Sequence, residues 1–208
     1  NSLFKLLREE NPDYIAVVLD SKEPTFRHEL YTEYKATREK MPDELVEQLE
    51  PLYNVISHTN IPILKKPGYE ADDIIGTLVK KAEQAGLITY MVTGDKDMMQ
   101  LVSEMTFMYS PGNSFKPTTI YDKIKVKEKW GVEPKGIIDM LALVGDSSDN
   151  IPGVDGVGPK TAKKLLDEYK DIETILKHAD EAKNKRVREG LQNGKDLVHL
   201  SRELVTIH

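Results

Sequence analysis

The sequence has 208 residues, 39% hydrophobic and 31% charged, which is enough to bury the core of one large domain or two small ones. It contains no cysteine, which excludes a disulfide framework and thiolate zinc sites and is typical of a reducing cytosol. Its longest apolar run, YIAVVL at residues 14–19, is far too short to cross a bilayer, and no basic leader precedes a hydrophobic stretch, so we expect no membrane partner and a cytoplasmic location.

The formal net charge of −6 at pH 7, taken alone, argues against a nucleic-acid partner. The charge is unevenly distributed, however, and basic side chains gather in residues 22–40, 123–130, 160–166 and 183–188. Such runs most often form solvated helix faces. A surface that binds phosphate groups is the alternative, and composition leaves both open.

The first half of the chain alternates between short apolar runs and amphipathic segments. We expect strands in residues 13–20 (DYIAVVLD), 61–66 (IPILKK) and 87–95 (LITYMVTGD), and helices in 2–11, 41–59 and 71–86. Residues 25–40 are charged and aromatic without a clear apolar stripe, and we expect this segment to be mobile. The alternation predicts an α/β layer structure with a largely parallel central sheet flanked by helices.

After a fourth predicted strand in residues 105–112, helices predominate, joined by loops rich in glycine and proline. We expect these helices in residues 122–131, 134–145, 159–169, 172–179 and 195–204. We therefore place a boundary near residue 133. It separates an α/β core of residues 1–133, which includes the charged segment 22–42, from a helical subdomain of residues 134–208.

Four groups of acidic residues stand out in the sequence. They are Asp20 after the first strand, Glu70, Asp72 and Asp73 in GYEADDIIGTL, Asp95 and Asp97 in GDKD, and Asp146 and Asp149 in GDSSD. Each group has an ordinary explanation, because acids in a first helical turn favour the helix dipole and Asp is common in turns. Two groups, however, follow predicted parallel strands, at the edge where α/β folds place their ligand sites. We therefore favour one shared site.

Eight carboxylates in one site need a counter-charge, because mutual repulsion would otherwise keep several of them protonated. An all-oxygen ligand set without Cys or His favours Mg²⁺ or Mn²⁺ over zinc. Such a set suits a two-metal site, with ions ~3.5–4 Å apart, that hydrolyses a phosphodiester. Phosphate-ester hydrolysis is therefore the leading predicted reaction.

A second motif, NIPGVDGVGPKTAKKLL, combines a glycine loop with a basic helix. The glycines permit a tight turn, and Pro159 suits the first position of the helix that follows. Free N–H groups at such a helix start can bind a phosphate, with charge supplied by lysines on the next turns. A purely structural turn is the alternative. We favour duplex DNA, with contacts from Gly153, Gly156, Gly158, Lys160, Lys163 and Lys164.

Six segments, in order, resemble the 5′ nuclease domain at the N-terminus of bacterial DNA polymerase I, a relative of the flap endonucleases. They are VVLD, TFRHELYTEYKATR, MPDELVEQLEPL, GYEADDIIGTL, VTGDKDMMQLV and LVGDSSDNIPGVDGVGPKTA, and they extend over nearly the whole chain. The resemblance implies a PIN-like 5′ nuclease core and a helix-hairpin-helix-like subdomain. It also implies a metal-dependent, structure-specific nuclease that removes 5′ flaps and RNA primers in replication and repair.

The implied partners are DNA with a 5′ flap or nick, an RNA primer–DNA hybrid and a covalently linked polymerase domain, in the nucleoid-associated cytoplasm of a bacterium. The resemblance assigns all eight acids above as metal ligands, and the six from Asp20 to Asp97 as catalytic. It places Arg27, Tyr34, Lys35 and Arg38 in an arch over the 5′ single strand. It also assigns the loop 153–158 to a hairpin that contacts the duplex and in relatives can hold a monovalent cation such as K⁺.

The sequence departs from the family pattern at one point. That pattern begins with another strand, which carries a metal-ligating Asp upstream of the first helix, and we expect this chain to be a piece of a longer protein. Two alternatives to a 5′ nuclease follow. One is a flap- or duplex-binding module whose catalysis is impaired, and the other is an RNA-cleaving nuclease with a similar acidic core.

Overall fold

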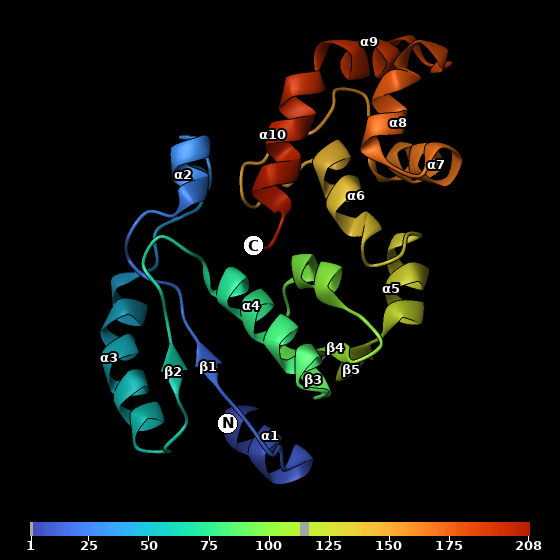
Figure 1. The fold of residues 1–208 in the computed structure, drawn as a ribbon. Coiled ribbons are helices and arrows are strands. Elements are labelled where there is room, and N and C mark those ends of the chain that lie inside the picture. Colours follow the sequence, from blue (N-terminus) through green and yellow to red (C-terminus); the bar gives the residue numbers. More distant parts are fainter. Residues whose placement is uncertain (1, 113–116) are drawn as a thin grey trace.

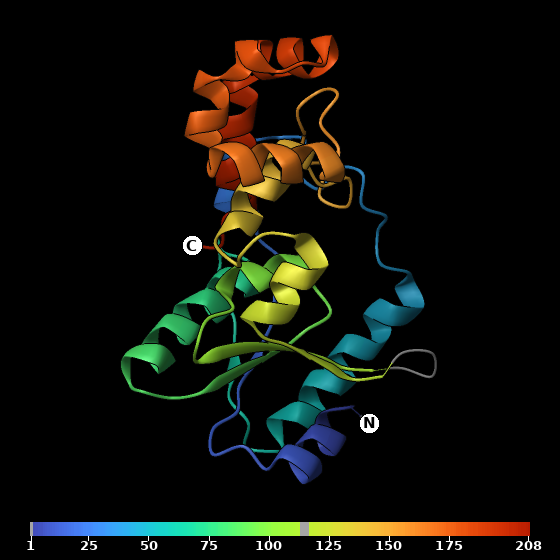
Figure 2. The same ribbon diagram turned by 90° about the vertical axis from the view of Figure 1, so that its right-hand side faces the viewer.

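The computed structural model describes residues 2–112 and 117–208, apart from the side chain of Ser2. An α/β part lies below a helical part, and the two meet along α6 (Gly136–Val144) (Figures 1 and 2). The chain begins with α1 (Ser2–Glu10) at the far end of the α/β part. It ends where the two parts meet.

The strands of the α/β part are short and form two small sheets. In the first, β1 (Val17–Val18) pairs in parallel with β2 (Ile63–Leu64). In the second, β3 (Thr89–Val92) pairs in parallel with β4 (Thr106–Ser110), and β5 (Thr119–Tyr121) is antiparallel to β4. The predicted α/β class with mostly parallel pairing is confirmed. Among the described residues, however, the strands are divided between two sheets and do not form the one central sheet that we expected.

Helix α4 (Ala71–Gln84) lies between the two sheets and directs its first turn toward the helical part (Figure 1). It packs against β1, β3 and the 3₁₀ helix η1 (Lys96–Leu101). Its buried positions are Asp73, Gly76 and Val79, three residues apart on one face. An acidic side chain therefore occupies the first position of the buried stripe. Helix α3 (Asp43–Ser57) flanks the first sheet and follows Pro42, as the sequence predicts.

The helical part is built around α6, which is apolar on nearly all sides and buried over most of its length. It packs against α7 (Pro159–Tyr169), α10 (Lys195–Val205) and η1. The other elements of the helical part are α8 (Ile172–Lys177), η2 (Ala179–Glu181) and α9 (Lys185–Asn193), whereas α5 (Lys123–Trp130) packs against β5 in the α/β part. The contact between α6 and η1 connects the core of the helical part to the α/β part.

The structure differs from the sequence-based expectations in three places. Within residues 25–40 it shows a short helix, α2 (Phe26–Leu30), and the side chains of Arg27 and Tyr34 are buried, where we expected a mobile segment. Residues 185–193 form α9 because Val187 and Leu191, one helical turn apart, are buried within a basic run. The strand β5 escaped prediction because three residues are too few to show a periodicity.

Across the described residues, every helix is too short or too polar to cross a membrane.

Candidate active site

A hollow lies where the first turn of α4, η1 and the GDSSD loop meet the segment after α2. Five of the predicted acidic residues line it, namely Glu70, Asp72, Asp95, Asp97 and Asp149. Four predicted DNA-binding residues also line it, namely Arg27, Tyr34, Lys35 and Arg38. The fold therefore brings side chains from four separate segments to one place.

The start of α4 supplies two of these acids, and its backbone also binds Asp20, which follows β1. Glu70 is the N-cap residue of the helix and Asp72 follows in its first turn. The carboxylate of Asp20 accepts a hydrogen bond from the backbone N–H of Ala71 at 2.8 Å. Asp20 thus sits beside the acidic turn, although it does not line the hollow itself.

The GDKD turn supplies the next two acids. Asp95 caps η1, because its Oδ1 accepts a hydrogen bond from the backbone N–H of Asp97 at 2.9 Å. The Oδ1 atom of Asp97 is buried, and no group in the described part of the chain hydrogen-bonds it. A buried carboxylate oxygen without a partner is costly, so this atom calls for a cation or another ligand.

The GDSSD loop closes on itself and contacts η1. Asp146 and Ile151 exchange backbone hydrogen bonds of 2.9 and 2.8 Å, and the Oδ1 of Asp146 accepts from the backbone N–H of Ser148 at 2.8 Å. The Asx turn that the sequence offered as an alternative is therefore present. The ammonium of Lys96 lies 2.8 Å from the other oxygen of Asp146. Burial acts to raise the pKa of Asp146, but Lys96 and the hydrogen bonds from Ser148 together hold that pKa below its usual value.

The segment after α2 bridges the acids of the two parts. The hydroxyl of Tyr34 lies 3.0 Å from Oε2 of Glu70 and 3.2 Å from Oδ2 of Asp149. Burial, reinforced by Glu70 and Asp149, raises the pKa of Tyr34 above its usual value, so the hydroxyl remains a donor. Lys35 forms an ion pair with Glu70, and Arg38 lies 2.5 Å from Oδ1 of Asp149.

The pKa values of two acids in the hollow are strongly raised. Burial, with Asp95, Glu70 and Asp20 nearby, raises the pKa of Asp72 to about 7. Burial, with Asp95 and Asp146 nearby, raises the pKa of Asp97 to about 7 as well. Both shifts mean that full ionisation of the cluster is unfavourable without further positive charge.

The donor set fits a divalent cation, because it consists of carboxylate oxygens and includes the unpartnered Oδ1 of Asp97. In residues 2–112 and 117–208, however, no three His, Cys, Asp or Glu side chains are grouped closely enough to hold a metal ion in this conformation. Ion pairs keep the carboxylates apart from one another, because three of them face basic side chains. The pairs are Glu70–Lys35, Asp146–Lys96 and Asp149–Arg38. The predicted ligand set stays a prediction.

The glycine loop lies outside this hollow. Gly156 has a positive φ of 78°, and a side chain at Gly153 would meet the carbonyl oxygen of Val144 at 2.2 Å. Gly158 is the N-cap of α7 and Pro159 occupies its first turn, as the sequence predicts. The side chains of Lys160, Lys163 and Lys164 are exposed along α7. The loop thus leaves a helix start and three lysines open to solvent.

Two predicted site residues, Arg27 at the wall of the hollow and Asp73 behind it, are paired with each other. Asp73 and Arg27 are each 2% exposed and form an ion pair with two hydrogen bonds of 2.8 Å. Burial acts to raise the pKa of Asp73, but the hydrogen bonds and charge of Arg27, with the backbone N–H groups of His208 and Glu70, together hold that pKa below its usual value. The sequence carried a signal for this arrangement, because Glu70 and Asp73 have capping-box spacing, and the N–H of Glu70 donates to Asp73.

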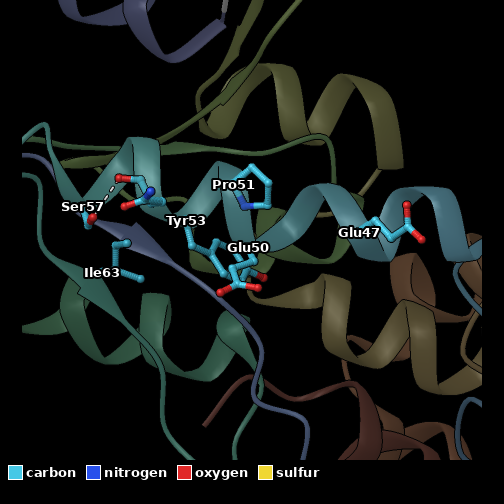
Figure 3. Close-up of a pocket in the computed structure, with 7 residues that line it drawn as sticks. Glu47, Glu50, Pro51, Tyr53, Ser57 and Ile63 are labelled. Atoms are coloured by element: carbon cyan, nitrogen blue, oxygen red, sulfur yellow. Dashed lines mark hydrogen bonds between the residues drawn. The ribbon is translucent and has the colours of Figure 1, made fainter.

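A wider hollow lies elsewhere, on the side of α3 that faces β2 (Figure 3). Its lining includes Glu47, Glu50, Tyr53, Ser57 and Ile63. None of the predicted site residues lines it, so the chemistry assigned above belongs to the smaller acidic hollow.

Comparisons with known proteins cover the whole chain. Residues 1–131 match the family described as 5′-3′ exonuclease, N-terminal resolvase-like domain, and residues 132–208 match 5′-3′ exonuclease, C-terminal SAM fold. The chain is 43% identical to DNA polymerase I of Caldicellulosiruptor bescii and 43% identical to that of Bacillus subtilis, over 100% and 99% of its length. It spans 24% and 23% of those two relatives, about a quarter of their length. A 5′-3′ exonuclease of Aquifex aeolicus is 41% identical over 99% of this chain and 68% of its own.

Solved structures share the fold. A structure of T5 5′-exonuclease with bound divalent metal ions (zinc) matches 98% of this chain and 78% of its own with a TM-score of 0.84, at 23% identity. The catalytic core of Rad2 in complex with DNA substrate matches 90% of this chain and 61% of its own with a TM-score of 0.57, at 17% identity. These likenesses establish the arrangement of the elements.

Proposed function

We propose that this chain, which belongs to the 5′-3′ exonuclease family, is a divalent-metal-dependent, structure-specific nuclease that hydrolyses phosphodiesters at 5′ flaps and 5′ ends of DNA. One observation carries the proposal. Acidic side chains from the start of α4, from η1 and from the GDSSD loop surround one hollow, and in it Oδ1 of Asp97 is buried without a hydrogen-bond partner among the residues that the structure describes.

Glu70, Asp72, Asp95 and Asp97 would hold the cation, with Asp20, Asp146 and Asp149 at the margins of the site. We propose Mg²⁺ or Mn²⁺ and two ions, because the donors are carboxylates and T5 5′-exonuclease binds divalent metal ions. When bound, such ions supply an activated water and stabilise the leaving oxygen of a phosphodiester.

The basic side chains beside the hollow would guide the substrate. Lys35 and Arg38 lie at the acids Glu70 and Asp149, and both are partly exposed, at 20% and 51%. They can therefore exchange a carboxylate for a phosphate of the 5′ strand when that strand enters. Tyr34 is buried between the same two acids, so it holds the two parts of the site at a fixed separation.

The duplex would lie along the glycine loop. The helix start at Gly158 and the exposed Lys160, Lys163 and Lys164 suit contacts to the phosphate backbone, which set register without reading sequence. A K⁺ ion in the loop 153–158 is part of the proposal, as are RNA primer–DNA hybrids as substrates. We also propose a linked polymerase domain. The chain matches about a quarter of the length of two relatives that are named DNA polymerase I.

Family membership favours the nuclease over a DNA-binding module without catalysis. The Rad2 core, whose fold this chain shares, was solved with a DNA substrate, which supports DNA over RNA as the main target.

A direct test uses a labelled 5′-flap duplex and the 208-residue chain. We expect cleavage near the flap junction with Mg²⁺ and none with EDTA, because the carboxylates act through the cation. Ca²⁺ serves as the control for binding without turnover. Equal cleavage in EDTA would contradict the metal dependence. Flap binding without cleavage in either Mg²⁺ or Mn²⁺ would instead support the binding module.

A further inference from the structure

The last residues of the chain cross the boundary between the two parts. The C-terminus lies beside the start of α4, as both views show (Figures 1 and 2). Here residues 204–208 run from the end of α10 past α2, α4 and η1, and each of these elements contributes one polar side chain that binds this C-terminal segment. The three side chains are Arg27, Asp73 and Gln100.

Arg27 uses all five of its N–H donors within the protein. Its Nε donates to the carbonyl oxygen of Leu204 at 2.8 Å, and Nη2 donates to that of Thr206 at 2.7 Å. Its two terminal nitrogens also donate to the two oxygens of Asp73, and Nη1 approaches Glu70 at 3.4 Å. A guanidinium has five donors in a fixed fork. No donor of Arg27 is left for a phosphate.

The carboxylate oxygens of Asp73 likewise have all their acceptor positions filled by groups of the protein. One oxygen accepts from Arg27 and from the backbone N–H of His208 at 3.0 Å. The other accepts from Arg27 and from the backbone N–H of Glu70, also at 3.0 Å. A carboxylate offers about four acceptor sites, and all are used here. The oxygens of Asp73 therefore have no free position for a metal ion.

Gln100 holds the same segment from the side of η1. Its amide donates to the carbonyl oxygen of Val205 at 2.9 Å and accepts from the N–H of Ile207 at 3.0 Å, as a neighbouring strand would. Gly76 permits the close approach of α4, because a Cβ there would lie 2.7 Å from Cγ2 of Ile207. The C-terminal segment thus packs tightly against the two elements that carry Asp72 and Asp97.

We propose that Arg27 and Asp73 form a buried clamp that fastens the C-terminal segment to the first turn of α4 and so positions Glu70 and Asp72. In this assignment Arg27 is a positioning residue and not a DNA contact, and Asp73 is a positioning residue and not a metal ligand. The site that the clamp positions rests on the proposed function. The clamp itself is open to test in metal-free protein without DNA.

The first measurement is thermal unfolding in EDTA of Arg27→Gln, Asp73→Asn and the double variant. Each single change leaves a buried charged partner behind, so we expect a fall in Tm of about 10 °C. The double variant should lose clearly less than the sum, because both charges are then gone. Arg8→Gln and Asp13→Asn, at exposed positions, are the matched controls. Shifts no larger than those of the controls would overturn the clamp.

The second measurement separates the clamp from ligation and DNA contact. In folded protein we expect Asp73→Asn to keep the Mn²⁺ stoichiometry and to lose less Mn²⁺ affinity than Asp72→Asn, which should bind Mn²⁺ at least about tenfold more weakly because it removes a direct ligand. Arg27→Gln should keep the salt dependence of flap binding. Equal loss of Mn²⁺ binding in both Asp variants, or a salt slope reduced by about 1 in Arg27→Gln, would overturn the assignment.

A milder variant covers the case in which the clamp variants do not fold. Gln100→Ala removes the acceptor of the Ile207 amide, so that amide should exchange with solvent at least about tenfold faster. We also expect kcat to fall while KM for the flap substrate stays unchanged, because the segment positions acids and does not bind DNA. Unchanged exchange at Ile207 would contradict the fastening of the C-terminal segment on which the clamp depends, even if the nuclease is active, and loss of nuclease activity alone would not contradict it.

Discussion

The acidic hollow and the buried clamp place neighbouring carboxylates in opposite situations. Asp72 and Asp73 are consecutive in the first turn of α4, and both are shielded from solvent. Asp73 is balanced by Arg27, which lowers its pKa, whereas Asp72 faces other acids and has its pKa raised to about 7. Asp73 is 2% exposed and Asp72 is half-buried, and the larger difference lies in whether their carboxylate oxygens have partners.

This comparison shows how to assign acids in a crowded motif. A carboxylate whose acceptor sites are all used by the protein contributes to stability, because its charge is already compensated. A carboxylate that is buried among like charges is costly until a cation arrives, so its position is explained by function. The same turn of α4 therefore contributes both to the fold and to the proposed chemistry.

The largest effect is expected from Asp95→Asn set against Asp73→Asn. We expect Asp95→Asn to lower the single-turnover rate on a flap duplex by about 100-fold or more, because it removes charge that would hold the cation. Flap affinity in Ca²⁺ and Tm should remain close to those of the unchanged chain, since Asp95 is exposed. Asp73→Asn should show the opposite pattern, in which the fall in Tm is the main effect and the fall in cleavage rate is the smaller one. Flap affinity lost in proportion to the rate would contradict the role given to Asp95.

The next effect is a pH dependence of stability that arises in the hollow and not in the clamp. The pKa values of Asp72 and Asp97 are raised to about 7 from an ordinary 3.8, so between these values the folded chain binds more protons than the unfolded chain. Stability in EDTA should therefore fall as pH rises from about 4 to about 7. Tm measured across this range should slope downward, and Mg²⁺ should flatten the slope.

The variants Asp72→Asn and Asp97→Asn provide the control for that slope. Each removes one titrating group, so each should reduce the fall in Tm between pH 4 and pH 7. Asp73 acts with the opposite sign, because its lowered pKa adds stability above pH 4 that is lost as the pH drops further. A Tm that rises steadily up to pH 7 in EDTA would show that the carboxylates of the hollow are compensated in some other way.

The sequence predicted the elements that carry the site better than it predicted the contacts within the site. The positions of the first four strands and of most helices follow from apolar runs and periodicity and from signals such as Gly86, which has a φ of 74° after α4, although the strands are shorter than predicted. The convergence of the acids followed from the rule that ligand sites lie at the carboxyl ends of parallel strands. The division into two sheets did not follow, because register between distant strands has no local signal.

The clamp could not be predicted from the sequence because its residues are far apart in the chain. The family resemblance grouped Arg27 with Lys35 and Arg38, yet its guanidinium donates to the carbonyl groups of Leu204 and Thr206. Gln100 has no local pattern that would predict its two bonds to the C-terminal segment. Asp73 alone had a usable signal, its capping-box spacing from Glu70.

The smallest effect is expected at the glycine loop, which lies outside both regions. Lys160 is exposed near the start of α7, and we expect Lys160→Ala to weaken duplex binding only a few-fold and to reduce the slope of log affinity against log salt by about 1. Lys80→Ala, at an exposed position of α4, is the matched control. The cleavage rate at saturating flap DNA should be unchanged in both variants, because neither side chain reaches the hollow. If Lys160→Ala lowers that rate without changing the salt slope, the loop affects the acids directly, and the separation of duplex binding from the acidic hollow fails.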